Sequence, residues 1–326
     1  MLILSAADVR RAAPMPAAID AVAAAFVELS GGQATVPLRL PIGQPQHDAV
    51  TFFMPAHLAH SNALGLKVVS VFPHNQQRQG LPSIHALVVL LDAETGRPVA
   101  AMDGTYLTAL RTGAGSGAAT RALARPDARV LALFGAGAQA PQQAHAICAV
   151  RPIERIWIVN RGRERAEALC LTLQEQGIQA EIRLAESASA ALAEADVICC
   201  ATRAATPLFA DADLRPGTHI NGVGSYTPEL AEVPPATVGR ARVVVDQRAA
   251  AWAEAGDLIQ ARDAGLLDES NIVELGEVLA GQAVGRSDAE QITFFKSVGN
   301  AVQDMAVGQV ALAEARRLGL GTEVAL

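Results

Sequence analysis

Three cationic side chains lie in apolar surroundings in the first part of the chain. Lys67 stands within LGLKVVSVF, Arg39 within VPLRLPI, and Arg111 directly after LTAL. An unpaired ammonium or guanidinium is costly to bury, so each group needs a partner or a role. An arginine fork binds a carboxylate through two hydrogen bonds, and a desolvated lysine can have its pKa lowered into the range useful for proton transfer. Each residue alone could be a salt-bridged or snorkelling side chain, but together they predict a cationic pocket for an anionic substrate.

The stretch LPSIHAL adds two polar candidates to this group. Ser83 could supply a hydrogen bond and His85 a proton relay. An ordinary histidine in the core or at a sheet edge is an equally good interpretation of His85. The candidate catalytic residues are therefore Lys67, Arg111, Arg39, Ser83 and His85.

Two glycine runs between residues 110 and 143 both fit the spacing G-x-G-x-x-A. A dinucleotide-binding loop must leave a strand and open a helix, because the phosphates bind free N–H groups at the helix N-terminus. The run that begins at Gly135 follows the strand-like RVLALF and precedes a helix-compatible segment. The run that begins at Gly113 follows a helix-like segment, so its small residues predict close helix packing. We expect a dinucleotide at Gly135 and Gly137, with a purely structural turn as the alternative.

The end of the next strand bears on which dinucleotide is bound. An Asp or Glu there would bind the ribose 2′-hydroxyl of NAD. The sequence instead has Asn160 and Arg161, followed by Arg163 and Arg165. A guanidinium at this place can pair with the 2′-phosphate of NADP, although a solvated basic helix start has the same appearance. We expect NADPH, with NADH as the alternative.

The elements that position these residues fall into two groups. The first, over residues 1–125, predicts an α+β domain with a helix at 16–29 that ends at SGG. Strands are expected at 35–42, 49–55, 63–73 and 84–92, with a turn between two strands at 92–104. Strands that follow one another without helices favour an antiparallel or mixed sheet.

The second group begins after residue 125. Strand-like segments occur at 129–135, 155–160, 180–184, 195–202, 218–224 and 241–246, with helix-like segments at 138–150, 162–177 and 187–195. This alternation predicts a parallel sheet with helices on both faces, a Rossmann-like domain over residues 126–299. A long helical pattern follows, and residues of about 300–326 are assigned with the first domain. The predicted fold class is α/β.

Composition disfavours several classes of function. The chain has 326 residues, of which 51% are hydrophobic, and a formal net charge of −7 with a pI of about 5.5, which argues against nucleic-acid binding. Its cysteines lack C-x-x-C spacing, so we expect neither disulfides nor a metal site, and a cytoplasmic location. The first residues lack a basic region before the apolar stretch, and no apolar run reaches about 18 residues. We therefore expect neither a signal peptide nor a membrane span.

Several longer segments carry a resemblance beyond these patterns. They are VPLRLPI, LGLKVVSVFPHN, GLPSIHALVVLLDAETGRPVAAMDG, LTALRTGAGSGAAT, LFGAGAQA, IWIVNR, NGVGSY, VVVDQ, EAGDL and FFKSVGNAVQD. In order and spacing they resemble the ornithine cyclodeaminase/mu-crystallin family over nearly the whole chain. The resemblance implies a homodimer whose N-terminal domain binds substrate and forms the dimer interface, with a C-terminal helix that returns to that domain.

The resemblance also implies roles for individual residues. Arg39, Lys67 and Arg111 look like the family's substrate-carboxylate and catalytic residues, and IVNR is similar to the NADPH-using mu-crystallin branch. The expected dinucleotide contacts are Gly135, Ala136, Gly137, Ala138, Gln139, Asn160, Arg161, Arg165, Thr202, Val223, Gly224, Ser225, Lys296, Ser297 and Gly299.

One segment departs from the family's pattern. Ornithine cyclodeaminases carry an aspartate after the glycines that follow the fifth strand, where it handles the substrate's amino group. Here Ser225 and Tyr226 stand at that place, and Glu229 lies three residues later. Hydroxyl groups cannot hold or deprotonate an ammonium as a carboxylate does, so ornithine cyclisation is disfavoured.

The resulting expectation is an NAD(P)H-dependent reductase of small cyclic imino acids. The substrates would be 1-pyrroline-2-carboxylate and 1-piperideine-2-carboxylate, reduced to L-proline and L-pipecolate. An alanine dehydrogenase-like enzyme and an ornithine cyclodeaminase are the alternatives among enzymes. A mu-crystallin-like protein that binds NADPH and a small molecule without turnover is the alternative from another class.

Overall fold

The computed structural model describes residues 1–325. The chain forms two compact units: Met1–Arg111 with Asn300–Leu326 is unit 1, and Thr112–Gly299 is unit 2. The division falls inside helix α4 (Gly104–Leu123), whereas the sequence predicted a boundary at residue 125. The predicted boundary lies further along the chain because it was placed where strand–helix alternation begins, and a continuous helix leaves no break in the sequence.

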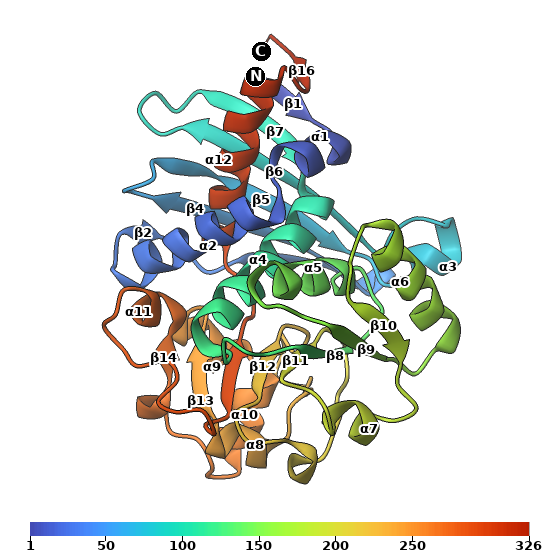
Figure 1. Cartoon of the computed structure of the whole chain (residues 1–326). Coiled ribbons are helices and arrows are strands. Elements are labelled where there is room, and N and C mark those ends of the chain that lie inside the picture. Colours follow the sequence, from blue (N-terminus) through green and yellow to red (C-terminus); the bar gives the residue numbers. More distant parts are fainter. Residues whose placement is uncertain (326) are drawn as a thin grey trace. The chain divides into compact units, whose positions relative to one another are not determined.

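Unit 1 contains a mixed sheet with helices, as shown in the upper part of Figure 1. Its strands are β1 (Leu2–Leu4), β2 (Ala34–Thr35), β3 (Leu40–Gln44), β4 (Ala49–Leu58), β5 (Ala63–Val71), β6 (Ile84–Asp92), β7 (Pro98–Asp103) and β16 (Thr322–Glu323). Its helices are α1 (Ala6–Ala12), α2 (Met15–Ser30), α3 (Asn75–Gln79) and α12 (Ala301–Leu318). The sheet order is β16-β1-β7-β6-β5-β4-β2, with β3 also paired to β4, and β1 runs parallel to β7.

The predicted elements of unit 1 are largely confirmed, with one exception. Strand β6 has the predicted bounds, and α2 differs from its prediction by one residue at each end. The single strand predicted over 35–42 is wrong, because β2 ends at Thr35 and β3 begins at Leu40. Pro37 lies in this gap, and proline cannot donate to a strand ladder.

Helix α12 covers one face of the unit 1 sheet. It packs against β4, β5 and β6 and against α2. The side chains between these layers alternate along β5, where Ala63, Gly65, Lys67 and Val69 are buried. Residue 65 must be glycine because β6 and α12 approach it closely. A Cβ at Gly65 would lie 2.9 Å from the Met305 Sδ and 2.1 Å from the Val89 carbonyl oxygen.

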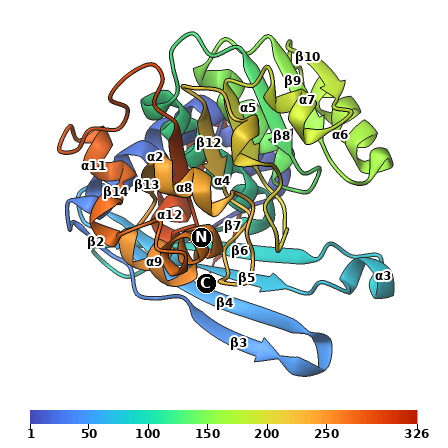
Figure 2. The ribbon, with the colours of Figure 1, turned by 90° about the horizontal axis from the view of Figure 1, so that it is seen from below.

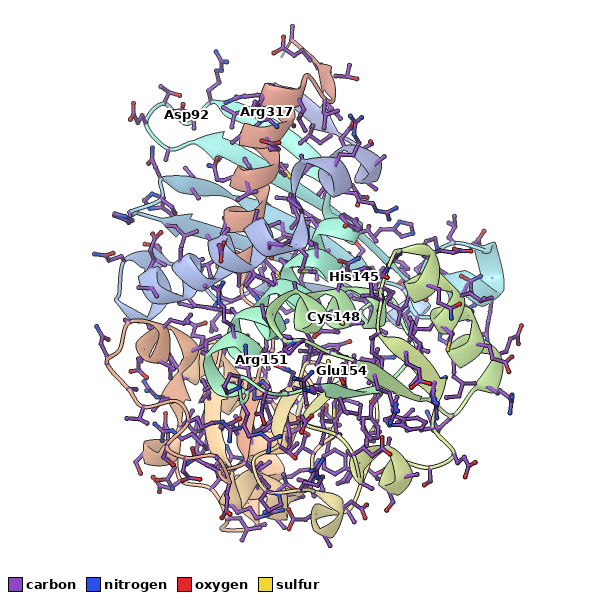
Figure 3. All side chains as sticks on the ribbon, in the orientation of Figure 1. Asp92, His145, Cys148, Arg151, Glu154 and Arg317 are labelled. Atoms are coloured by element: carbon purple, nitrogen blue, oxygen red, sulfur yellow. The ribbon has the colours of Figure 1, made fainter. Side chains whose placement is uncertain are left out.

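The β6–β7 turn is closed by a side chain labelled in Figure 3. Asp92 Oδ1 accepts hydrogen bonds from the backbone N–H groups of Glu94 and Thr95, at 3.0 and 2.9 Å. Gly96 follows with a φ of 72°, a conformation that favours glycine. The turn predicted within 92–104 is therefore confirmed.

Unit 2 is a parallel sheet covered on both faces. Its strands are β8 (Val130–Phe134), β9 (Arg155–Val159), β10 (Glu181–Leu184), β11 (Val197–Cys200), β12 (His219–Gly222), β13 (Arg242–Val245), β14 (Val273–Glu274) and β15 (Thr293–Lys296). Its helices are α5 (Ala140–Val150), α6 (Arg163–Glu175), α7 (Ala188–Leu192), α8 (Pro235–Arg240), α9 (Arg248–Glu254), α10 (Gly256–Asp263) and α11 (Leu275–Leu279). The strand order is β10-β9-β8-β11-β12-β15-β13-β14.

Alternate residues of β8 enter two separate apolar cores. Leu131 and Leu133 pack with α5 and α6, whereas Ala132 and Phe134 pack in a second cluster with residues of α9 and α10. The strand order reverses its direction of growth between β8 and β11, which is where doubly wound sheets bind ligands. The predicted Rossmann-like fold is confirmed; strands β14 and β15 were not predicted.

The first glycine run is buried inside α4. A Cβ on Gly113 would lie 2.5 Å from the Gln142 carbonyl oxygen, so α4 and α5 can pack at this distance only because the residue is glycine. The predicted role of this run in helix packing is confirmed.

The cysteines and helices bear on two further expectations. Cys148, Cys170, Cys199 and Cys200 are free thiols, and burial raises the pKa of Cys148 on α5 to about 11 (Figure 3). Within residues 1–325, no single helix is long and apolar enough to cross a membrane, and only α1 and α2 taken together as a bent pair reach that length.

Candidate active site

A buried ion cluster occupies the α12 side of the unit 1 sheet. The Lys67 ammonium on β5 donates to Asp304 Oδ2 on α12 at 2.8 Å, and Arg111 Nε on α4 lies 3.3 Å from Asp304 Oδ1. Lys67 is 1% exposed, Arg111 6%, and Asp304 fully buried. Two buried cations therefore share one carboxylate, which leaves one positive charge for a ligand.

Gln303, the neighbour of Asp304, fixes Arg111 on its other side. Its Oε1 accepts from Arg111 Nη1 at 2.7 Å, and its Nε2 donates to the Arg111 carbonyl oxygen at 3.3 Å. The same Oε1 accepts from the backbone N–H of Asn300, the N-cap of α12, at 3.0 Å. The capping arrangement that starts α12 therefore also holds the guanidinium.

Arg39 lies close to this cluster but not within a strand, contrary to the prediction. It is half-buried between β2 and β3, and its guanidinium carbon lies 5.4 Å from the centre of the Phe52 ring. Phe52 shares a sheet face with Lys67, because Met54, two residues along β4, pairs with Lys67. The three predicted cations are therefore brought to one face.

The pKa of Lys67 is lowered to about 8, chiefly because burial removes water from the ammonium. The positive charge of Arg111 lowers it further, with a smaller effect from Arg39. Asp304 acts in the opposite direction through its charge and its hydrogen bond. The ammonium thus has a pKa suited to proton transfer near neutral pH.

The structure does not bring Ser83 and His85 into this cluster, contrary to expectation. Lys67 pairs with Val88 on β6, and His85 lies three residues before Val88, so its side chain is on the opposite face of the sheet. His85 is exposed, and Ser83 Oγ donates to the Pro73 carbonyl oxygen at 3.5 Å.

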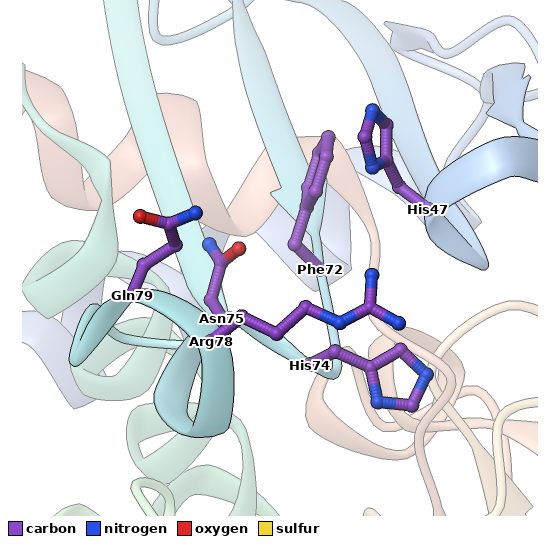
Figure 4. Close-up of a pocket in the computed structure, with 6 residues that line it drawn as sticks. All are labelled: His47, Phe72, His74, Asn75, Arg78 and Gln79. Atoms are coloured by element: carbon purple, nitrogen blue, oxygen red, sulfur yellow. The ribbon is translucent and has the colours of Figure 1, made fainter.

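A separate hollow of about 160 Å³ lies near α3 (Figure 4). Its lining side chains are His47, Phe72, His74, Asn75, Arg78 and Gln79. None of the predicted site residues belongs to it. Its side chains are half-buried or exposed, which is unlike the buried ion cluster around Lys67.

The second glycine run has the geometry of a dinucleotide loop. Gly135 follows β8 with a φ of 101°, and a Cβ there would lie 2.7 Å from the Ala201 carbonyl oxygen. A Cβ on Gly137 would meet no atom within 4 Å, so the backbone at this position is open to a phosphate. Helix α5 has no side-chain cap at its N-terminus, and the buried Gln139 Oε1 has no hydrogen-bond partner within residues 1–325. These features fit a bound dinucleotide.

The other expected cofactor contacts gather at the carboxyl edge of the unit 2 sheet. Glu232 joins the loops after β11 and β12, since Oε1 accepts from the Thr202 N–H at 2.6 Å and Oε2 from the Gly224 N–H at 2.8 Å. A Cβ on Gly224 would lie 2.0 Å from the Thr202 carbonyl oxygen. Burial raises the pKa of Glu232. This carboxylate therefore holds the loops after β11 and β12 together at the carboxyl edge of the sheet.

Ser225 and Lys296 form a buried triad with Asp257. Ser225 Oγ donates to Asp257 Oδ2 through a short hydrogen bond and accepts from the Lys296 ammonium at 2.7 Å. Lys296 lies 3.2 Å from the same Asp257 oxygen, and all three residues are fully buried. The Ser225 and Lys296 side chains, which were expected to contact a dinucleotide, are thus engaged with the protein.

The segment after β15 is held by another buried acid. Asp246 Oδ2 accepts from Ser297 Oγ at 2.8 Å and from the N–H groups of Val298 and Gly299 at 3.0 and 2.8 Å. Gly299 has a φ of 87°. Asp246 thus holds the Ser297 side chain and the Gly299 backbone, both of which were expected near the cofactor.

Of the polar side chains that follow β9, some are bound within the protein and others are exposed. Asn160 Nδ2 donates to the Gly162 carbonyl oxygen at 2.8 Å, and Arg163 pairs with Glu167. Arg161 and Arg165 are exposed, and neither makes an ion pair within residues 1–325.

The sequence-based prediction missed four acids and amides at these sites: Asp304, Gln303, Asp257 and Glu232. Asp304 had a usable signal, because a carboxylate within the apolar helical run GNAVQDMAVGQV needs a buried partner. Asp257 and Glu232 lie in loops and short helices whose contacts depend on distant residues, so no local pattern marks them.

Three comparisons with known proteins bear on these sites. The chain is 40% identical over 329 residues to a Delta(1)-pyrroline-2-carboxylate reductase of Bacillus cereus, across 99% of each protein. The structure of Thermococcus litoralis Delta(1)-pyrroline-2-carboxylate reductase with NADH and L-proline is similar with a TM-score of 0.94 and 39% identity, over 99% of this chain and 100% of that one.

An archaeal alanine dehydrogenase dimer with bound NAD is similar with a TM-score of 0.91 and 32% identity, over 100% of this chain and 99% of that one. The sequence profile of the ornithine cyclodeaminase/mu-crystallin family matches residues 1–316. The chain therefore belongs to the ornithine cyclodeaminase/mu-crystallin family.

Proposed function

We propose that the protein is an NAD(P)H-dependent reductase of small cyclic imino acids, converting 1-pyrroline-2-carboxylate or 1-piperideine-2-carboxylate to L-proline or L-pipecolate. The observation that carries the proposal is the buried Lys67–Asp304–Arg111 cluster, in which one positive charge is left for a substrate carboxylate. The relatives named pyrroline-2-carboxylate reductase support the choice of substrate.

In this proposal each cation has a distinct role. Arg111, with Arg39 nearby, binds the carboxylate and orients the ring, because a guanidinium fork fixes both position and angle. Lys67 donates a proton to the imine nitrogen as the C=N bond is reduced, and then regains one from solvent. When bound, the dinucleotide supplies the hydride that adds to the imine carbon.

Ornithine cyclisation is disfavoured by the triad around Ser225. The carboxylate that contacts Ser225 is Asp257, whose Oδ2 accepts from Ser225 and pairs with Lys296. Its Oδ1 accepts from the N–H groups of Glu232 and Val233. No oxygen of this acid is left to hold a substrate ammonium. Reductive amination of an open-chain 2-oxo acid is the second candidate, because the alanine dehydrogenase is also similar.

We propose NADPH as the preferred cofactor, bound at Gly135, Gly137 and the α5 N-terminus. The support is the pair of exposed guanidinium groups of Arg161 and Arg165, which have the chemistry to bind a 2′-phosphate. NADH is the alternative, since two similar structures hold NADH or NAD.

A panel of cofactors and substrates tests the function. Purified protein is mixed with NADPH or NADH and with each imine, with pyruvate plus ammonia, or, in the oxidising direction, with ornithine and NAD. We expect NADPH oxidation with one or both cyclic imines. Absence of turnover with both imines, at protein concentrations where NADPH binding is measured, would refute the proposal and favour a binding protein.

We further propose a homodimer formed through the sheet face opposite α12. The cross-strand row Leu40, Phe53, Val68 and Leu87 lies on this face, and Leu40 and Leu87 are 60% and 46% exposed. The long strands β3 to β6 that carry it are visible in Figure 2. Leu87→Glu is expected to give a monomer by sedimentation, whereas Leu171→Glu, on exposed α6, is expected to leave the dimer intact.

We also propose a cytoplasmic location, where the free thiols stay reduced.

A further inference from the structure

Lysine is rare in this chain and entirely buried. Of the 26 lysine and arginine residues, only Lys67 and Lys296 are lysines. They are 1% and 0% exposed, and each contacts one fully buried aspartate, Asp304 or Asp257. Lysine thus occurs only where an ammonium is placed against a buried acid, and the other residues of this group are arginines.

Asp304 contacts both cations of the unit 1 cluster from a rigid position. It lies in the first turn of α12, behind the Asn300 cap. Its Oδ2 accepts the only hydrogen bond that Lys67 donates within residues 1–325, so the ammonium keeps two N–H groups for a ligand. Its Oδ1 faces Arg111 Nε at 3.3 Å without a hydrogen bond. One carboxylate therefore sets the direction of the ammonium.

Charged groups face Lys67 from three parts of unit 1. Asp304 faces it from α12, Arg111 from α4, and Arg39 from the segment before β3. Its cross-strand neighbours, Met54 on β4 and Val88 on β6, carry no charge. Asp304 is the one negative charge among these groups.

We propose that Asp304 is a positioning residue that keeps Lys67 protonated and aimed, so that Lys67 can donate its proton to the imine nitrogen. The proposal rests on the proposed function for its last step only. In that step an N–H bond of Lys67 breaks and an N–H bond of the product amine forms. The carboxylate itself exchanges no proton and contacts no substrate.

The electrostatics of the cluster give this proposal its measurable consequence. Burial and the charge of Arg111 lower the pKa of Lys67, and Asp304 opposes both. Removing the charge in Asp304→Asn should therefore lower the pKa of Lys67 further, by about 1–3 pH units. The fraction of charged Lys67 would then fall at neutral pH.

Lysine labelled with carbon-13 at Cε gives a direct test, because the whole chain contains only two such signals. Lys67→Gln assigns them by removing one. In Asp304→Asn the Lys67 midpoint should move to lower pH while the Lys296 signal stays unchanged. Glu28→Gln removes another buried acid of unit 1, which accepts from the His60 N–H, and should leave both signals unchanged. An unmoved Lys67 midpoint in Asp304→Asn would overturn the proposal.

Steady-state kinetics distinguishes the effect of the position of the Asp304 carboxylate from the effect of its charge. In Asp304→Asn the high-pH limb of kcat/KM for imine reduction should move with the Lys67 midpoint, while the affinity for NADPH is unchanged. Asp304→Glu keeps the charge but moves the carboxylate, so its Lys67 midpoint should stay near that of the wild type while kcat falls. Wild-type kcat in Asp304→Glu would refute positioning, even if Asp304→Asn failed to fold. A shifted midpoint with no imine reduction by the wild type would refute the proposed function and leave the effect of Asp304 on Lys67 intact.

Discussion

Substituting the two glycines of the second run should separate the stability of the loop from its affinity for a dinucleotide. At Gly135, alanine meets two penalties: a φ of 101°, and a Cβ placed 2.7 Å from the Ala201 carbonyl oxygen. The backbone strain alone costs about 1–3 kcal/mol. For a chain of this size that corresponds to a fall in Tm of about 1–5 °C, before the steric contact is added.

At Gly137, alanine meets neither penalty. Its φ is not positive, and a Cβ there has no neighbour within 4 Å. Gly137→Ala should therefore keep the wild-type Tm to within about 1 °C. The added methyl group would occupy the space through which a phosphate approaches the backbone, so the Kd for NADPH should rise at least about tenfold.

The two variants are compared by thermal unfolding without cofactor and by fluorescence titration with NADPH. We expect Gly135→Ala to lose both stability and affinity, and Gly137→Ala to lose affinity alone. Wild-type NADPH affinity in Gly137→Ala would refute the assignment of this loop. Wild-type stability in Gly135→Ala would show that the loop relaxes around the added methyl group.

Three further predictions concern the charged residues. Arg111→Lys should raise KM for the imine by about 10–100-fold because a single ammonium cannot replace the fork, and steady-state kinetics with unchanged NADPH affinity checks this. The rate constant kcat/KM for imine reduction should fall as pH rises through about 8, because the reaction needs protonated Lys67 and the pKa of Lys67 is lowered to about 8. A flat kcat/KM profile from pH 7 to about 10 would exclude Lys67 as the proton donor. Arg161→Glu should weaken NADPH binding at least about tenfold with little effect on NADH, whereas Arg163→Gln, whose guanidinium pairs with Glu167, should change neither much.

Local patterns were sufficient for most of the fold and for part of the site. Strand β6 and helix α2 could be predicted because their periodicity and end signals lie within the segment itself. The choice between the two glycine runs was decidable for the same reason, since β8 precedes one and α4 contains the other. Arg39 and His85 were harder, because a sequence does not state the register that places Phe52 on the face of Lys67 and His85 on the opposite one.

The acids were missed for a different physical reason. Asp304 meets Lys67 across 237 residues of sequence, and Asp257 meets Ser225 across 32. Sequence reasoning could state that a buried ammonium needs a partner, but not which carboxylate supplies it. Such pairs are set by how helices dock on sheets, and that information is distributed over the whole core.

Comparison of the two lysine clusters indicates where an anionic substrate can bind. In unit 2, Lys296 contacts Asp257, and Glu232 and Asp246 add further buried carboxyl groups whose oxygens accept backbone N–H groups. Burial raises the pKa of both Glu232 and Asp246, because removal of water disfavours their charged forms. In unit 1 the balance is reversed, because Lys67 and Arg111 share the single carboxylate of Asp304. An added carboxylate would complete the charge balance of the unit 1 cluster. This balance supports the proposal that the substrate anion binds at Lys67 and Arg111, whereas the acids of unit 2 hold the loops at the edge of its sheet.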